Sequence, residues 1–167
     1  MDYLWSPWRF RYVSEGVKTG ACPFCSMARA DPARDREQYI LLRARRNFVF
    51  LNLFPYSPGH ILVAPYAHVA SLGDLEDPVL HEMITLARRV EQALKAVYHF
   101  EGFNLGLNQG RCAGAGVADH LHLHALPRWI GDANFISVVG ETRVLPEDLD
   151  TTYTKLQDYF QDGGCQK

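Results

Sequence analysis

The chain has 167 residues, 47% of them apolar, which is enough for one domain that buries a core without disulfides. Its 17 basic and 19 acidic residues leave a net charge of −2, which argues against a protein that grips a nucleic acid polymer through a basic face. No stretch has the pattern of a signal peptide or approaches the roughly 18 apolar residues of a membrane span. These features predict a cytoplasmic protein that does not associate with membranes.

The chain divides into three parts. Residues 1–19 are rich in aromatic side chains, and we expect an arm that packs on the body of the protein or on a second subunit. Residues 20–145 hold the main domain. Residues 146–167 are expected to form a C-terminal helix, opened by Pro146, and then a disordered tail.

The main domain is predicted to have an α+β fold, with an antiparallel sheet and one major helix packed on it. A cysteine knuckle and a polar loop come first. Residues 48–53 and 60–64 then predict the two strands of a hairpin around a Pro-Tyr-Ser-Pro-Gly turn. Apolar residues at three- and four-residue steps predict a helix over 78–98. Residues 103–108 and 120–126 predict two further strands, joined by a loop rich in glycine and alanine.

Three of the seven histidines occupy alternate positions, at His120, His122 and His124. Since successive side chains of a strand point to opposite faces, the histidines share one face and the intervening leucines share the other. The leucine face belongs in the core, and the imidazole face is expected to open into a polar site. Imidazole can be a nucleophile, a proton carrier or a metal ligand near neutral pH. Two chemistries therefore remain open: a catalytic metal held by the histidines, and attack of one histidine on phosphorus.

The loop before the histidines contains Gly110, Gly114 and Gly116. Glycines free the backbone to turn its amides inward, and such amides form a nest for anions. A simple hairpin connection is the alternative, but beside a row of histidines a phosphate cradle is favoured.

A second motif, "CPFC", holds Cys22 and Cys25. This spacing supplies two thiolates to a tetrahedral zinc, which needs two more ligands from elsewhere. In a cytoplasmic protein such a pair indicates a metal or redox site before a disulfide. A redox dithiol competes with zinc, although no thioredoxin-like strand–helix pattern accompanies the motif. Two unmetallated buried cysteines are the plain alternative.

Four stretches together resemble the histidine-triad (HIT) superfamily of nucleotide hydrolases and transferases. "HLHLHAL" resembles its His-φ-His-φ-His-φ-φ signature, and "FLNLFPYSPGHILVAPYAHVASL" is similar to its first hairpin. "GLNQGRCAGAGVADH" is similar to its phosphate loop, and "PRWIGDANF" to the segment after the triad in bacterial and diadenosine-polyphosphate-cleaving members. The resemblance covers residues 20–137 and implies a HIT-like fold, which in this family is usually a homodimer.

The resemblance implies an enzyme that cleaves the α-phosphate bond of dinucleoside polyphosphates, diadenosine tetraphosphate or triphosphate, through a covalent nucleotidyl-histidine. His122 matches the nucleophile, His124 the histidine at the phosphate oxygens or leaving group, and His60 a fourth histidine in the hydrogen-bond network behind the triad. The residues implied to contact the nucleotide are Asn52 at the ribose and Asn108, Gly116 and Val117 at the phosphate. Phe50 and Leu62 flank Asn52 on the same hairpin and are candidates to sandwich the base, with plain core packing as the equal alternative.

The resemblance also implies a structural zinc. Its ligands would be Cys22, Cys25, His68 and His120, and a site closed by four protein ligands leaves no position for a substrate. One departure from the family concerns the phosphate loop, where many members carry Gln or Ser close before the first triad histidine. Here the sequence is Gly-Val-Ala over 116–118, so that contact must come from the main chain or be absent.

Several functional alternatives stay open at this stage. The sequence does not separate hydrolysis from phosphorolysis, which differ only in the second acceptor. A purine nucleoside phosphoramidase is the other enzyme reading of the resemblance. A nucleotide-binding module without turnover would bind AMP tightly and form no adduct, and a metallohydrolase would use the triad as ligands.

Overall fold

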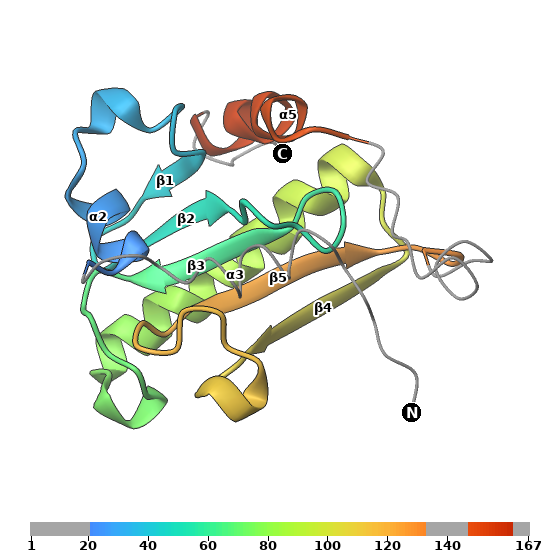
Figure 1. The fold of residues 1–167 in the computed structure, drawn as a ribbon. Coiled ribbons are helices and arrows are strands. Elements are labelled where there is room, and N and C mark those ends of the chain that lie inside the picture. Colours follow the sequence, from blue (N-terminus) through green and yellow to red (C-terminus); the bar gives the residue numbers. More distant parts are fainter. Residues whose placement is uncertain (1–20, 133–146, 162–167) are drawn as a thin grey trace.

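A computed structural model describes residues 21–132 and 147–161 (Figure 1), so the expected arm, Pro146 and the expected tail lie outside the described residues. One antiparallel sheet has its five strands in the order β1-β2-β3-β5-β4. The strands are β1 (Ile40–Arg43), β2 (Asn47–Leu51), β3 (Ile61–Pro65), β4 (Gly102–Leu107) and β5 (Leu123–Arg128). The helices are α2 (Pro23–Arg29), α3 (Asp77–Tyr98) and α5 (Leu149–Gln161). The α+β prediction is confirmed.

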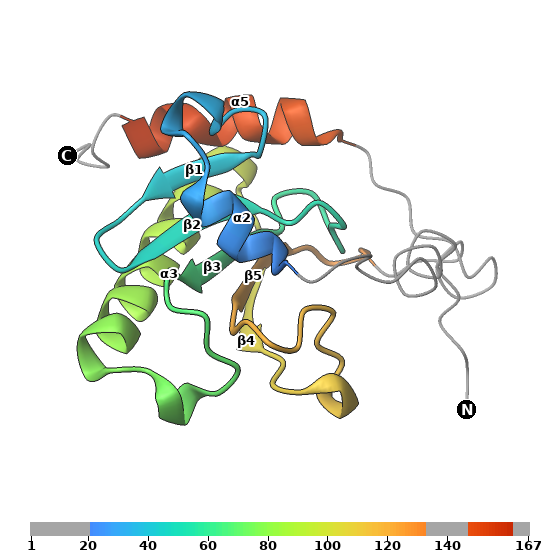
Figure 2. The ribbon, with the colours of Figure 1, turned by 60° about the vertical axis from the view of Figure 1, so that its left-hand side comes forward.

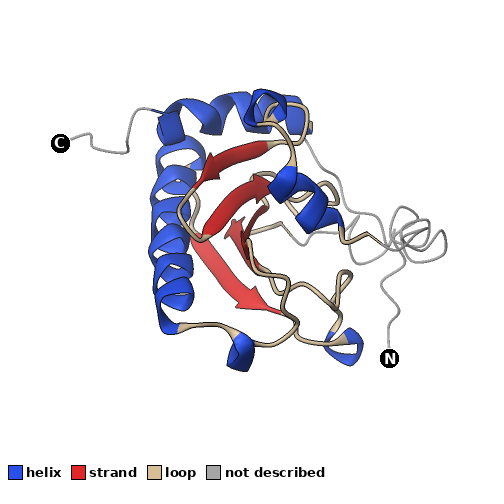
Figure 3. Ribbon diagram, turned by 90° about the vertical axis from the view of Figure 1, so that its left-hand side faces the viewer, coloured by secondary structure: helices blue, strands red, loops and turns tan. Residues whose placement is uncertain are grey.

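Helix α3 covers one face of the sheet (Figure 3). A proline in its first turn suits its start, because that position has no intrahelical donor to lose. His99, in the left-handed conformation, ends it. Its buried stripe packs into the main core, as the apolar periodicity predicts. The residues of that stripe are Val79, Met83, Leu86, Ala87, Val90, Ala93 and Leu94.

Helix α2 lies on the opposite face of the sheet (Figures 2 and 3). It contributes Phe24 to a second, smaller apolar cluster, in which Phe48 and Phe50 of β2 and Leu62 of β3 are also buried. The sheet is therefore buried on both faces where β2 and β3 run, and every residue of those two strands is buried.

Two local expectations were wrong. The segment expected to be a knuckle and polar loop, residues 21–39, contains helix α2, and strand β1, which follows it, was not expected. The final strand begins at Leu123 rather than His120, so the first two histidines of the triad precede it. The reason is a change of partner: β5 pairs with β3 only as far as Leu123 and Val63, and the Leu121 amide instead donates to Val69 O at 2.7 Å.

Helix α5 packs beside β1 and α3 (Figure 1). The Tyr153 hydroxyl donates to Ile40 O of β1 at 3.1 Å. At the other end of the contact, Glu147 accepts hydrogen bonds from the hydroxyls of Tyr98 on α3 and Thr152. Among the described residues, no helix has both the length and the apolar composition that crossing a membrane requires.

Candidate active site and adjoining metal-ligand cluster

The three histidines and the residues between them lie on opposite sides of the sheet, as the strand periodicity predicts. Leu121, Leu123 and Ala125 are buried in the core beneath α3. The expected polar opening on the histidine side is only partly present, since His120 and His122 are 0% and 4% exposed. The cause is Phe24 of α2, whose ring packs edge-on against both imidazoles, with centroids 5.4 and 5.0 Å away. The sequence motif gave no sign that α2 would cover this side.

The backbone fixes the tautomer of His122. Its Nδ1 lies 2.9 Å from the carbonyl oxygen of His120, and a carbonyl oxygen can only accept. Nδ1 therefore carries the proton, and Nε2 holds the lone pair. Within the described residues nothing hydrogen-bonds to that Nε2, so it remains available as a nucleophile.

Two successive hydrogen bonds assign the opposite tautomer to His124. The Tyr56 amide donates to His60 Nδ1 at 3.1 Å, so neutral His60 carries its proton on Nε2. His60 Nε2 lies 2.9 Å from His124 Nδ1, which must then accept. His124 is left with its proton on Nε2. The rings of His122 and His124 lie 4.9 Å apart, which places a nitrogen lone pair and an N–H donor in one site.

Burial keeps the imidazoles of His122 and His124 neutral. Desolvation lowers the pKa of His122, opposed by its hydrogen bond to His120 O. Desolvation, and then the neighbouring His122, lower the pKa of His124 to about 4. At neutral pH His124 is thus a hydrogen-bond donor and carries no positive charge.

A row of cross-strand neighbours shows where the site opens. Phe50, Leu62, His124 and Gly106 lie opposite one another across β2, β3, β5 and β4. Phe50 and Leu62 are 2% and 3% exposed, and Phe50 stacks on Phe48 with centroids 4.8 Å apart. Both side chains proposed for the base are thus part of the apolar cluster in this structure. At the other end of the row, a Cβ on Gly106 would meet nothing within 4 Å, so the row opens beside His124.

The glycine-rich loop folds back on itself over part of its length. Three consecutive amides, from Ala113 to Ala115, donate to carbonyls of residues 110 and 111, which removes them from any anion nest. The amides of Gly116 and Val117 donate to no group within the described residues, so these two can still receive a ligand's oxygen atoms.

The two asparagines expected at the nucleotide differ in how they are held. Asn52 Nδ2 lies 3.2 Å from His60 Nδ1, and its Oδ1 accepts from the Phe54 amide at 3.0 Å. Asn52 therefore belongs to the network behind the triad in this structure. Asn108 follows β4, and its Nδ2 lies 3.9 Å from the position that a Cβ on Gly114 would take, which puts its amide at the loop.

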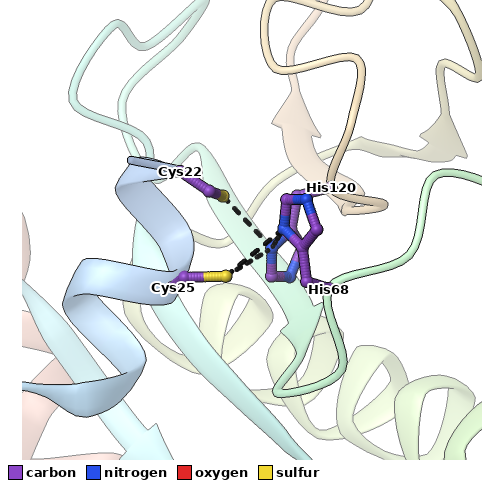
Figure 4. Close-up of side chains that lie close together, drawn as sticks. All are labelled: Cys22, Cys25, His68 and His120. Carbon is purple, nitrogen blue, oxygen red and sulfur yellow. Dashed lines mark hydrogen bonds between the residues drawn. The ribbon is translucent and has the colours of Figure 1, made fainter. Parts of the chain in front are cut away.

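A cluster of four possible metal ligands adjoins the triad, and its ligand atoms all lie within 4.8 Å of one another (Figure 4). Cys22 and Cys25 come from the start of α2, His68 from the loop after β3, and His120 from the triad. Cys22 Sγ and His68 Nδ1 each lie 3.3 Å from His120 Nδ1, and Cys25 Sγ lies 3.3 Å from His68 Nδ1. This cluster can hold a metal ion.

The groups around this cluster suit it for binding a metal ion. His120 Nε2 lies 2.9 Å from Pro65 O, so the proton is on Nε2 and the Nδ1 lone pair faces the cluster. Burial raises the pKa of the Cys25 thiol, and the Cys22 thiol adds to the rise. A divalent cation among the sulfur atoms reverses that preference and favours thiolates. The cluster shares His120 with the triad, so it joins α2 to the segment that leads into β5.

Two residues of the site escaped the sequence analysis. Phe24 lies between the two cysteines and packs on His122; only recognising "CPFC" as a helix would have revealed its inward direction. Tyr56 supplies the amide that fixes His60, and its ring stacks on His124 with centroids 6.2 Å apart. Its contribution comes partly from the main chain, which no side-chain motif records.

Three alternating histidines that lead into a strand of an antiparallel sheet, beside a glycine-rich loop, define a histidine-triad protein. Comparison with known families agrees: the HIT domain matches residues 34–129, more than half of the chain, and the chain belongs to the HIT family.

Individual relatives cover most of the molecule. An AP-4-A phosphorylase from Mycobacterium tuberculosis is 39% identical over 157 residues, which cover 91% of this chain and 80% of the relative. An asymmetrical bis(5'-nucleosyl)-tetraphosphatase from Schizosaccharomyces pombe is 36% identical over 89 residues, 53% of this chain and 48% of the relative. A zinc-bound histidine-triad protein from Mycobacterium smegmatis superposes with a TM-score of 0.68 at 25% identity, over 86% of this chain and 96% of that structure.

Proposed function

We propose that this protein is an enzyme that cleaves dinucleoside polyphosphates, with diadenosine tetraphosphate as the favoured substrate, at the α-phosphorus through a nucleotidyl-His122 intermediate. The observation that carries the proposal is the pair of opposite tautomers: a lone pair on His122 Nε2 beside a proton on His124 Nε2. The likeness to an AP-4-A phosphorylase over 91% of the chain supports this choice of substrate.

In the first step His122 Nε2 attacks the α-phosphorus and forms a P–N bond, while the P–O bond to the remaining polyphosphate breaks. The imidazole becomes positively charged, and its Nδ1–H stays on His120 O, which stabilises that charge. The negative charge on the phosphoryl oxygens would be met by the amides of Gly116 and Val117 and by the Asn108 side chain.

His124 would donate a hydrogen bond from Nε2 without giving up its proton. With a pKa of about 4, almost none of it is an acidic imidazolium at pH 7. A phosphate leaving group needs no such acid, because its own second ionisation lies near pH 6. An amine does need a proton on departure. The neutral His124 therefore favours a phosphoanhydride over a phosphoramidate as substrate.

In the second step an acceptor oxygen attacks the same phosphorus, the P–N bond breaks and His122 returns to its neutral form. Inorganic phosphate as acceptor yields a nucleoside diphosphate, and water yields a nucleoside monophosphate. We propose phosphate, because the match to the phosphorylase spans 157 residues and the match to the tetraphosphatase only 89.

Intact-mass measurement after a brief mix with diadenosine tetraphosphate and an alkaline quench tests the route. We expect an added AMP mass on the wild type, none on His122→Ala, and the wild-type adduct on His81→Ala, an exposed histidine of α3. Turnover that persists in His122→Ala would contradict the assigned nucleophile. ADP formed only with added phosphate would support phosphorolysis, and AMP formed without it would contradict that choice of acceptor.

We further propose that the four-ligand cluster binds a structural zinc. A tetrahedral zinc would separate two nitrogen ligands by about 3.3 Å and a nitrogen from a sulfur by about 3.6 Å, and the distances here are 3.3 Å and 3.3 to 3.5 Å. When bound, zinc would supply a rigid cross-link and no open coordination position. Metal analysis should find one zinc per chain, which Cys22→Ser abolishes and Cys112→Ser, in the exposed loop, leaves unchanged.

A further inference from the structure

Helix α2 lacks the features that would hold it in place by itself. It has seven residues, its N-cap Cys22 makes no side-chain cap, and its first turn contains no acidic residue. Isolated helices this short are not stable in water, so its position must come from tertiary contacts. Its position matters, because Phe24 on this helix packs on His122.

Within the described residues, three sets of contacts hold α2. At its start, Cys22 and Cys25 belong to the metal-ligand cluster. In its first turn, between the two cysteines, Phe24 is buried against Phe50, 5.2 Å between centroids, and against His122. At its end, the guanidinium of Arg43 on β1 meets the last carbonyl groups.

The Arg43 contact is multidentate and partly buried. Its Nη1 donates to Ala28 O at 2.9 Å and its Nη2 to Met27 O at 3.0 Å. A weaker bond of 3.4 Å reaches Ala30 O. Asp35 holds the same guanidinium from the other side through bonds of 2.8 to 3.1 Å. A fixed cation thus gives Ala28 O a donor and adds a second donor to Met27 O, which also accepts from the Ala30 amide. Its charge suits the helix dipole there.

We propose that Arg43 is a positioning residue for both the metal site and the nucleophile: with the metal cluster it clamps α2 at its two ends, and this holds Phe24 on His122. Arg43 does not reach the ligand atoms or the triad. It acts through α2, by presenting Cys22 and Cys25 to the metal with the helix already docked. Metal binding and the covering of His122 are then two results of one docking event, and each favours the other.

The part of this proposal that concerns catalysis rests on the proposed role of His122. The part that concerns the clamp can be measured without any turnover. Zinc affinity reports whether the start of α2 holds its two cysteines in position. The rate at which diethyl pyrocarbonate modifies the His122 ring reports whether Phe24 still covers that ring.

The test compares Arg43→Met with Arg34→Met in the full-length chain. Arg34 makes a matched control, because its guanidinium donates to Glu37 on an exposed surface and touches no carbonyl of α2. We expect the zinc dissociation constant, measured by chelator competition, to rise about tenfold in Arg43→Met and to stay at the wild-type value in Arg34→Met. At limiting zinc, His122 in Arg43→Met should be modified faster, and saturating zinc should restore its protection.

Restoration by zinc separates positioning from simple damage to the fold. A residue that only stabilised the domain would lower its unfolding free energy without changing zinc affinity. Unchanged zinc affinity in Arg43→Met, or exposure of His122 that saturating zinc does not reverse, would overturn the proposal. If Arg43→Met does not fold, Asp35→Asn, which loosens the guanidinium but leaves it in place, should shift zinc affinity in the same direction by a smaller factor. A wild type without any AMP adduct would refute the proposed function and leave these two readouts unaffected.

Discussion

The two ring nitrogen atoms of His124 have different surroundings, and this difference determines which of them carries the proton. Nδ1 accepts from His60, and Nε2 keeps the only proton. Alternation in the sequence predicts that the three histidines share a face, but it does not predict their protonation. That depends on Tyr56, whose backbone amide reaches His60 across a turn. The same limit applies to Phe24, since no periodicity in "CPFC" shows that its ring covers His122.

His124 should make the stability of the protein depend on pH. Its pKa falls from the ordinary 6.5 to about 4 on folding, so between these values the unfolded chain binds a proton that the folded chain refuses. The unfolding free energy is therefore highest above pH 6.5 and declines as the pH falls toward 4, by roughly 3 kcal/mol from this group. Urea unfolding at pH 6.5 and pH 4.5 measures it. His124→Gln cannot titrate, and a decline as steep as that of the wild type would contradict the assignment.

At the scale of elements, long and periodic segments could be predicted and short ones could not. Helix α3 follows the apolar stripe within one residue of its expected start. Strand β1 has four residues and an irregular register with β2 between Ile40 and Leu42, so its own sequence hardly specifies it. Helix α2 likewise depends on distant partners, among them Arg43 and the metal-ligand cluster. What the sequence could not predict is therefore what tertiary contacts create.

The turn that joins β2 to β3 requires glycine at position 59. Gly59 has φ of +73°, and a Cβ there would lie 2.9 Å from Leu94 Cδ2 and 3.1 Å from Tyr98 Cε2 of α3. Gly59→Ala should lower the unfolding free energy by about 2 to 4 kcal/mol, through the left-handed backbone and the overpacked core. Gly73→Ala, whose Cβ would meet only Ser71 Oγ at 3.7 Å, is the control. Equal urea midpoints for the two variants would contradict this account.

Glu147 attaches α5 to α3 through bonds from Tyr98, Thr152 and Lys155. Burial opposes its charge, but the hydrogen bonds from Lys155, Tyr98 and Thr152 outweigh it and leave the pKa of Glu147 lowered. Its stabilising effect is therefore present above the unfolded pKa of about 4.5 and disappears as the pH falls through the folded pKa. Glu147→Gln should cost about 1 to 2 kcal/mol at pH 7. This loss of unfolding free energy should become smaller as the pH falls. If the wild type and Glu147→Gln differ in unfolding free energy by the same amount from pH 7 to pH 3, the role of the charge is contradicted.

At the scale of the whole molecule, the two faces of the sheet carry separate tasks. The face under α3 holds the larger core, which draws on β1 to β3, β5 and α5. The other face holds the triad, α2 and the metal-ligand cluster. Because α2 adds only Phe24 to the buried apolar residues, the larger core does not depend on it. This division would let a metal bound at the cluster act on the site without carrying the fold.

Removal of the metal should consequently loosen one region and leave the rest folded, unlike small zinc domains that unfold without their ion. After dialysis against a chelator we expect far-ultraviolet circular dichroism close to that of the zinc-loaded protein and a melting temperature lower by several degrees, since bound metal stabilises the native state by mass action. Limited proteolysis should then cut first between residues 21 and 35, where α2 loses the ligands at its start. Loss of most helical signal, or first cleavage within α3, would show that the metal supports the whole domain.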